Sequence, residues 1–408
     1  MGEANCQQYR VPLYGAAWVP LRDLYNLKKH PQKQEEEQKQ QEEEEKEETK
    51  SESTETTDKK NSWLVLSGGG GDSKSGITNS ILLTKYDSSS NSLSETPVAR
   101  HDTGTELPYR MAVHPRGEGL ICSFPESCRW FKWNAPASME SNDLGLRASD
   151  RVLAELENVG QQLALAFNRE GSALAVGSED GHLRVFKWPS MAIIIDQADA
   201  HSTLKDLDFS LDGRFLVSLG GGPCRIWDLE SANVVATLLK ENDEVFTSCR
   251  FSVNSNGTQI LYITAMRDRG GSIVSFDTSS WTRVSSKHLV RDPISAFNVS
   301  PDGEHLAIGT IQGDVFIYKS TNTRVSSIIK KAHIGLVTAL KFSEDSRLLV
   351  SASLDSSVRV TKTEEDGTLK GLTILVFALQ GLWFIMMIAI VFLLAYYHWN
   401  GIPLPFAY

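Results

Sequence analysis

Alternating large apolar and small or polar residues make up much of the chain, and the clearest example runs from residue 163 to residue 188. Large apolar residues occupy every second position from Leu163 to Phe167, as in a strand with one buried face. Two similar segments follow, and the turns before them contain Gly171 and Gly181. Because glycine adopts the positive φ that tight turns need, this stretch predicts three antiparallel strands joined by hairpins.

The same pattern returns several times along the chain. Its marker phenylalanines recur at intervals of about 42 to 46 residues, a spacing typical of WD repeats, at Phe167, Phe209, Phe251, Phe297 and Phe342. Each WD repeat forms a four-stranded blade that buries both faces against its neighbours, so the ring of blades must close. The sequence therefore predicts an all-β, seven-bladed WD-repeat β-propeller over residues 62–363.

The N-terminal part of the chain differs from the repeats. Residues 1–21 contain a strand-like segment, Val11–Trp18, which we expect to close the propeller by completing the last blade. Residues 22–61 are rich in Glu, Gln, Lys, Ser and Thr, and they contain too few apolar residues to offset the entropy of ordering. This composition predicts an acidic disordered insert, with a solvated helix in its Glu-rich part as the alternative.

The C-terminal part contains a long apolar run. Residues 371–397 carry no charge and exceed the roughly 20 residues that a helix needs to cross a membrane. Lys362 and Lys370 precede the run and no Lys or Arg follows it, which predicts that the propeller is cytosolic and that residues 398–408 form a short tail across the membrane. No basic segment followed by an apolar core begins the chain, so no signal peptide is expected.

A glycine-rich loop is the main candidate for chemistry. It begins at Ser67, continues through Gly68, Gly69, Gly70 and Gly71, and ends at Asn79. Four glycines exceed what a simple turn needs, so we expect the backbone to approach an anion, a cation or a partner protein. A nucleotide-binding P-loop is excluded, because Ser73 stands where its second glycine should be and a strand follows instead of a helix.

Charge and composition exclude other classes of function. The net charge is -10, and residues 31–60 carry twelve acidic and six basic residues, so this segment supplies six of the ten excess negative charges. No basic block suggests nucleic acid as a partner. The five cysteines show no metal-ligand spacing and suit a reduced compartment. We expect no catalytic residues, and we expect His201 and His333 to form buried hydrogen bonds within blades.

These features together resemble the SEC-twelve-like family of endoplasmic-reticulum membrane proteins. The similarity covers nearly the whole chain except the insert, and it rests on the glycine loop, the propeller and the C-terminal span. Within the family, the chain is most similar to the plant branch called phosphate transporter traffic facilitator. Stretches that resemble this branch are Leu107–Pro115, Gly160–Phe167 and Val290–Phe297.

The resemblance implies a partner and a site. Members of the wider family are exchange factors for the Sar-type small GTPase, which recruits the COPII coat, and their glycine loop contacts the GTPase. Carried over by position, the contacting residues are Gly68, Gly69, Gly70, Gly71, Lys74, Gly76 and Asn79. The family loop also coordinates a potassium ion, which implies that the backbone carbonyls of Ser67 to Gly71 hold it here.

Two hypotheses about function follow from this resemblance. In the first, the chain is a single-pass protein of the endoplasmic-reticulum membrane that promotes exit of membrane cargo, with phosphate transporters as the expected cargo. In the second, it is an active guanine-nucleotide exchange factor for the Sar-type GTPase. The intact loop favours exchange. The branch-like stretches favour the cargo role. The acidic insert just before the loop also favours the cargo role, because we expect it to screen the GTPase surface.

Overall fold

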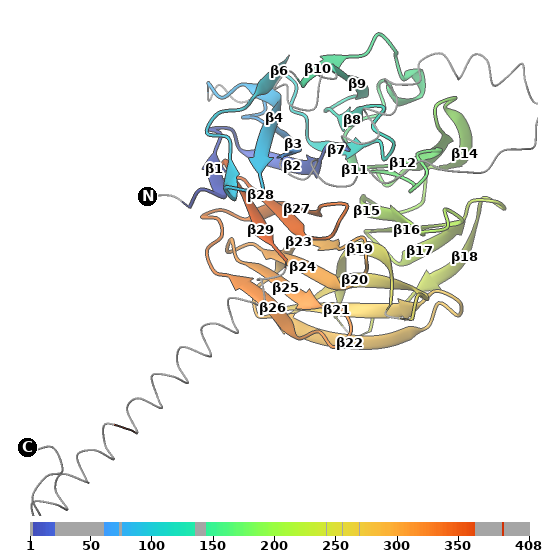
Figure 1. Cartoon of the computed structure of the whole chain (residues 1–408). Coiled ribbons are helices and arrows are strands. Elements are labelled where there is room, and N and C mark those ends of the chain that lie inside the picture. The colour runs from blue at the N-terminus through green and yellow to red at the C-terminus, as the bar shows by residue number, and fades with distance from the viewer. Residues whose placement is uncertain are drawn as a thin grey trace, which may run out of the picture. The chain divides into compact units, whose positions relative to one another are not determined.

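Among the described residues of the propeller, the regular secondary structure is almost entirely β-strand, and turns and loops join the strands (Figure 1). The computed structural model describes residues 3–20, 61–72, 76–134, 144–241, 243–254, 256–268, 270–363 and Met386. The chain divides into two units, Met1–Thr363 and Glu364–Tyr408. The expected membrane span and tail lie outside the described residues except for Met386, and nearly all of the expected insert lies outside them. No helix long and apolar enough to cross a membrane occurs among the described residues.

Seven antiparallel sheets form the blades, as the repeat spacing predicts. Blade 1 contains β2 (Leu13–Trp18), β3 (Asn61–Gly68), β4 (Asn79–Asp87), β5 (Ser92–Leu93) and β6 (Ala99–Gly104). Blade 2 contains β7 (Arg110–Val113), β8 (Leu120–Ser123), β9 (Cys128–Asn134) and β10 (Gly145–Ala148). Blade 3 contains β11 (Gln162–Phe167), β12 (Ala173–Ser178), β13 (Leu183–Lys187) and β14 (Ala192–Gln197), and the 3₁₀ turn η1 (Ala154–Leu156) precedes it.

The remaining blades follow the same plan. Blade 4 contains β15 (Leu204–Phe209), β16 (Phe215–Gly220), β17 (Cys224–Asp228) and β18 (Asn233–Leu238). Blade 5 contains β19 (Val245–Val253), β20 (Gln259–Arg267), β21 (Gly270–Asp277) and β22 (Arg283–Val290). Blade 6 contains β23 (Ile294–Val299), β24 (His305–Thr310), β25 (Val315–Lys319) and β26 (Val325–Ile329). Blade 7 contains β27 (Val337–Phe342), β28 (Leu348–Ser353), β29 (Ser357–Lys362) and β1 (Cys6–Gln8).

The ring closes through β1, which corrects the strand assignment made from the sequence. Residues Cys6–Gln8 pair antiparallel with β29, with Cys6 opposite Arg359. The segment Val11–Trp18, expected in that role, instead provides β2, the inner strand of blade 1, which pairs with β3. The reason is burial: β2 is buried or half-buried along its length and suits the inner position, whereas β1 is short and partly exposed, as an edge strand can be.

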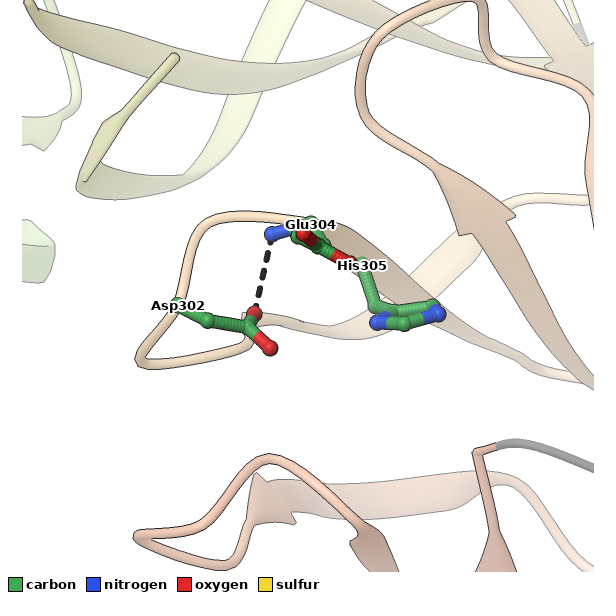
Figure 2. A group of neighbouring side chains, drawn as sticks. All are labelled: Asp302, Glu304 and His305. Atoms are coloured by element: carbon green, nitrogen blue, oxygen red, sulfur yellow. Dashed lines mark hydrogen bonds between the residues drawn. The ribbon is translucent and has the colours of Figure 1, made fainter. Parts of the chain in front are cut away.

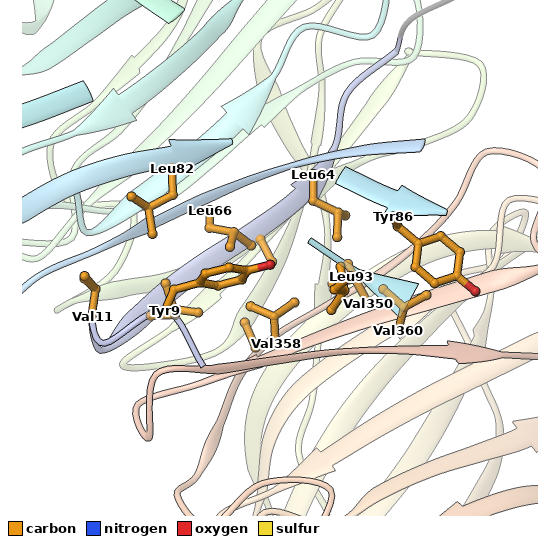
Figure 3. Packing of buried hydrophobic residues seen from close by; sticks show 13 residues of the cluster. Tyr9, Val11, Leu64, Leu66, Leu82, Tyr86, Leu93, Val350, Val358 and Val360 are labelled. Carbon is orange, nitrogen blue, oxygen red and sulfur yellow. The ribbon is translucent and has the colours of Figure 1, made fainter. Parts of the chain in front are cut away.

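Blades 1 and 7 meet in an apolar seam that the N-terminal segment fills (Figure 3). Tyr9 and Val11 are buried there between leucines of β3 and β4 on one side and valines of β28 and β29 on the other. The Tyr9 hydroxyl shares a hydrogen bond with the Thr84 hydroxyl (2.5 Å) and donates to the Ser94 carbonyl (2.8 Å). Residues from opposite ends of the chain thus build one core.

Contacts between neighbouring inner strands show that these strands run in one direction around the ring. Asp206 and Asp208 of β15 accept hydrogen bonds from the backbone N–H groups of Cys249 (3.0 Å) and Phe251 (2.7 Å) of β19, so the contacts advance in the same direction along both strands. Asn298 of β23 accepts the equivalent bond from the Phe342 N–H of β27 (3.2 Å). Because each blade is an antiparallel meander, all turns between second and third strands lie on one face. We call it the glycine-loop face, since the β3–β4 loop lies there.

The attachment points of the acidic insert lie on the opposite face. Pro20 follows β2 and Asn61 begins β3, and this end of the blade is separated from the loop by the length of β3. A strand rises about 3.3 Å per residue, so these ends lie roughly 25 Å apart. The insert precedes the loop in sequence but is attached at the opposite end of β3, so its screening of the GTPase surface stays a prediction.

Deleting residues 32–60 should leave the thermal unfolding midpoint of the propeller within a few degrees of the unmodified protein. The deleted segment contains no large apolar residues that could contribute buried area. Differential scanning calorimetry of the two proteins measures this directly. A drop of ten degrees or more would show that the segment packs against the blades.

Buried histidines have the structural role expected from the sequence. The Nε2 atom of His201 is 2.8 Å from the Ser218 hydroxyl, which also accepts a hydrogen bond from the Trp227 indole (2.8 Å). In blade 7, the Nε2 atom of His333 is 2.8 Å from the Ser351 hydroxyl. Burial lowers the pKa of each histidine to about 4, so both are neutral near pH 7.

Charged side chains from blades 4, 5 and 7 face one another near the middle of the ring. Arg250 donates to Asp206 (2.7 Å), and Lys341 interacts electrostatically with both of these residues and with Asp208. Burial raises the pKa of Asp208 to about 6, although the nearby Arg250 and Lys341 and the hydrogen bond from Phe251 oppose the shift. Ionised Asp208 is therefore less stable in the folded state than in the unfolded chain.

Replacing Asp208 by Asn should alter how stability depends on pH. A folded-state pKa above the ordinary value of 3.8 means that the contribution of Asp208 is fully present below pH 3.8 and is lost as pH rises through about 6. Between these two pH values, the free energy of unfolding of the variant, relative to that of the unmodified protein, should increase by up to about 1.4 kcal/mol for each unit by which the pH rises. Denaturant titrations at several pH values measure the difference.

The matched comparison is Asp208→Ala, which cannot accept the hydrogen bond from Phe251. Compared with Asp208→Asn, it should be less stable by about 1 to 3 kcal/mol at every pH, because a buried N–H loses its partner and neither variant titrates. Asparagine suits the position sterically, since blade 6 uses Asn298 for the same contact. A pH-independent difference between the Asn variant and the unmodified protein would contradict the raised pKa.

Candidate functional site: the glycine loop

The glycine loop connects β3 to β4 at the edge of blade 1. Gly68 is the last residue of β3 and pairs with both Ser80 of β4 and Leu13 of β2. The Gly69 N–H donates to the Pro12 carbonyl (3.0 Å), so the loop leaves the sheet while still held by the N-terminal segment. Lys74, one of the expected contact residues, lies outside the described residues.

Asn79 organises the base of the loop. Its side-chain oxygen accepts a hydrogen bond from the Gly71 N–H (2.9 Å), and its amide nitrogen donates to the Gly71 carbonyl (3.1 Å). The same nitrogen donates to the carbonyl of Gly104, the last residue of β6 (3.1 Å). Asn79 is only 2% exposed, so its three hydrogen bonds are shielded from water and fix the path of the backbone.

Glycine is required in the loop for two different reasons. A Cβ on Gly68 would lie 2.1 Å from the Pro12 carbonyl oxygen, and one on Gly69 would lie 2.1 Å from the side-chain oxygen of Asn79. Gly71 and Gly76 have open space around them, but their φ angles of 68° and 72° are rarely adopted by other residues. The first pair serves close packing and the second serves the turn.

The far side of the loop is open to solvent. Gly76, Ile77 and Thr78 are exposed, with 37% of Ile77 accessible. Arg100 of β6 donates to the Thr78 hydroxyl, which ties this side of the loop to the blade. The loop thus combines a rigid base with an accessible surface, an arrangement suited to contact with another protein.

The oxygen chemistry of the loop fits a weakly held cation. Backbone carbonyls are hard ligands that suit potassium, and Asp72 is the one carboxylate among the described loop residues. The buried Ser67 hydroxyl has no hydrogen-bond partner among the described residues. Strand pairing already engages the backbone of Ser67 and Gly68.

Several contacts of the loop could not be found from the sequence. The position of Asn79 follows from the family resemblance, but its partner Gly104 and the support from Pro12 and Arg100 do not. These residues lie on β2 and β6 or beside them, and no local pattern marks them as neighbours of the loop. Only the pairing of strands within blade 1 brings them together.

Asp302, Glu304 and His305 form a second group with potential ligand atoms, all within 4.8 Å of one another (Figure 2). Asp302 accepts hydrogen bonds from the Glu304 N–H (2.9 Å) and the Ser300 hydroxyl (2.5 Å). The same turn occurs where Asp212 follows Ser210, without the neighbouring Glu and His. The turn alone therefore explains the position of Asp302, and the group does not point to a metal site.

Comparison with known proteins agrees with the repeat pattern. The family described as "WD domain, G-beta repeat" matches residues 158–187 and 324–361. SEC12-like protein 2 of Arabidopsis thaliana is 54% identical over 369 residues, covering 90% of each chain. SEC12-like protein 1 of the same plant is 33% identical and covers 68% of this chain and 69% of its own length.

A more distant relative carries a name that states an activity. The guanine nucleotide-exchange factor SEC12 of Rattus norvegicus is 24% identical over 322 residues, covering 66% of this chain and 76% of its own length. The similarity to both plant proteins extends over two thirds or more of each chain, at identities of 54% and 33%. Similarity of this extent and level indicates that the proteins belong to one family. On this basis the chain belongs to the SEC12-like family of WD-repeat proteins.

Proposed function

We propose that this chain is a SEC12-family propeller, anchored in the endoplasmic-reticulum membrane, that promotes exit of membrane cargo in the early COPII pathway. The observation that carries the proposal is the glycine loop, which Asn79 holds in a defined conformation with an accessible far side. Phosphate transporters are the proposed cargo, because Leu107–Pro115 and Val290–Phe297 resemble the plant facilitator branch.

The proposed partner of the loop is a small GTPase of the Sar type. Of the residues implied by the resemblance, Gly68, Gly69 and Asn79 are buried, so they would hold the loop in place. Contact through Gly70, Gly71 and Gly76, with Lys74 as a further expected contact, would bring the GTPase to the propeller where the coat starts to assemble. Two observations favour exchange activity as a second candidate function: the intact glycine-rich sequence of the loop, and the exchange activity stated in the name of the rat relative. An exchange factor binds the nucleotide-free GTPase most tightly and so shifts populations without making bonds.

A potassium ion in the loop is part of the proposal. The backbone carbonyls of Ser67 to Gly71 would supply the contacts, and the Gly71 carbonyl also accepts a hydrogen bond from Asn79. When bound, the ion would neutralise carbonyl dipoles that turn toward one another. The loop residues themselves would orient the surface that meets the GTPase.

Two measurements test the proposal. In cells lacking this protein, a tagged phosphate transporter should accumulate in the endoplasmic reticulum, and normal arrival at the cell surface would contradict the cargo role. Release of a fluorescent guanine nucleotide from a purified Sar-type GTPase, with and without residues 1–370, tests exchange. Acceleration of nucleotide release that depends on potassium supports exchange. If release is unchanged and the transporter accumulates in the endoplasmic reticulum of cells lacking this protein, only the cargo role is supported.

Topology gives a further expected result. Lys362 and Lys370 precede the apolar run and no basic residue follows it, so protease added to sealed microsomes should digest the propeller. An epitope placed after residue 400 should stay protected until detergent is added. Protection of the propeller in sealed vesicles would contradict the proposed orientation.

A further inference from the structure

A cavity of about 470 Å³ lies at one end of blade 5, on the glycine-loop face. The turn between β20 and β21 forms one side, and Arg267 ends the first of these strands. The outer strand β22 forms another side with His288, and Arg291 follows this strand. The cavity therefore lies in blade 5 at the turn that corresponds to the glycine loop of blade 1.

The basic side chains of this cavity form no close ion pair among the described residues, although Arg267 interacts electrostatically with Glu244. Arg267, Arg291 and His288 form no hydrogen bond or ion pair with other described groups through their side chains. Most arginines in the strands of the propeller form a hydrogen bond or ion pair through their side chains. Arg250 and Arg283, for example, each pair with a carboxylate. Two guanidinium groups that line one cavity, neither of them in a close ion pair or hydrogen bond with a described residue, leave donors available to an anion.

The acidic groups of the wall offset only part of this charge. Glu244 is bound by Arg283 from outside the cavity, through two hydrogen bonds of 2.7 Å and 3.0 Å. Its side chain is only 8% exposed. Asp268 is the other carboxylate of the wall, so with Arg283 included three guanidinium groups stand against two carboxylates. Arg283 also pairs with Glu241 (3.3 Å), and Arg267 also acts on Glu244.

Neutral donors complete the cavity. Ser272 lies opposite His288 in the β21–β22 pair, and Ser286 lies two residues before His288 on the same side of β22. A Cβ on Gly270 would lie 2.3 Å from the His288 ring, so the glycine allows this ring to approach the turn. Two hydroxyl groups and an imidazole therefore line the same cavity as the two guanidinium groups.

We propose that this cavity binds a phosphate group, either as free orthophosphate or as a phosphoester. A phosphate dianion offers three or four acceptor oxygens and suits the planar donors of arginine, whereas a carboxylate could use only part of this donor set. The volume exceeds that of a phosphate ion alone, so there is room for the group that carries it. The proposal is independent of the exchange and cargo roles.

Isothermal titration of the full chain in detergent micelles tests the site, with sodium phosphate, O-phosphoserine and sodium acetate as probes at equal ionic strength. Phosphate or O-phosphoserine should bind at least about tenfold more tightly than acetate. Binding of both phosphate compounds indicates that the site accepts a phosphoester. Binding of orthophosphate alone assigns the site to the free ion.

Charge-removing variants separate the site from general surface charge. Arg291→Gln and Arg267→Gln should each weaken phosphate binding about tenfold. The control is Arg324→Gln, which removes an exposed arginine from the opposite face, in the turn between β25 and β26. Equal effects of Arg291→Gln and Arg324→Gln, or phosphate binding no tighter than that of acetate, would overturn the proposal. Thermal midpoints of all three variants verify that each is folded.

Discussion

Removing residues 1–11 should lower the free energy of unfolding of the propeller by roughly 5 kcal/mol or more, an amount comparable with the total stability of many domains. The deletion removes β1 and takes Tyr9 and Val11 out of the seam between blades 1 and 7. Loss of a buried aromatic side chain costs about 3 to 5 kcal/mol, and loss of a buried valine adds to this. The deletion also exposes the edge of β29 to pairing with other chains.

Urea titration of residues 1–363 and 12–363, followed by circular dichroism, measures the loss. The control is deletion of residues 32–60, which changes chain length more but leaves the seam intact. Tyr9→Phe isolates the hydroxyl and should cost about 1 to 3 kcal/mol, because Thr84 and Ser94 each lose a hydrogen-bond partner. An unchanged unfolding midpoint for 12–363 would mean that blade 7 closes with three strands.

Asn79→Ala should reduce the response of the GTPase at least about tenfold while the propeller remains folded. The substitution removes three hydrogen bonds from a side chain that is 2% exposed, two of them to Gly71 and one to Gly104. Each buried hydrogen bond contributes about 1 kcal/mol, so the backbone path of the loop should no longer be fixed. Nucleotide release or direct binding of the GTPase provides the measurement.

Two further variants sharpen this prediction. Gly69→Val should act like Asn79→Ala, because its side chain would collide with the oxygen of Asn79. Asn254→Ala is the matched control, since Asn254 holds only its own turn on the opposite face of blade 5. Full GTPase response in both loop variants would show that the loop is only a structural turn.

Much of the fold could be predicted because a blade is a local structure. The alternation from Leu163 to Phe167 and the glycines at the turns specify a meander within about 40 residues of chain. In blade 6 the marker was misplaced: Val299 occupies the position that Phe209 has in blade 4, and Phe297 lies two residues earlier on the same strand. Since both residues are on the same side of β23, the apolar pattern could not distinguish them.

The candidate site was only partly accessible to sequence reasoning. The four glycines and Asn79 stand close together in the chain, so their relation to one loop could be inferred from position. The collision that makes glycine necessary at Gly68 depends on the Pro12 carbonyl, which is more than fifty residues away. The basic cavity of blade 5 was not predicted, because Arg267 and Arg291 are separated in sequence and meet only through strand pairing.

The sequence by itself determined the blade as a repeating unit, the number of blades, and the family to which the chain belongs. Tertiary structure alone decided which strand closes the ring and on which face the insert is attached. Strand periodicity records which residues of a segment are buried, but it contains no information about the partner strand. The pairing of Cys6 with Arg359 joins the first and last strands of the propeller, and it is selected by the free energy of closing the whole ring.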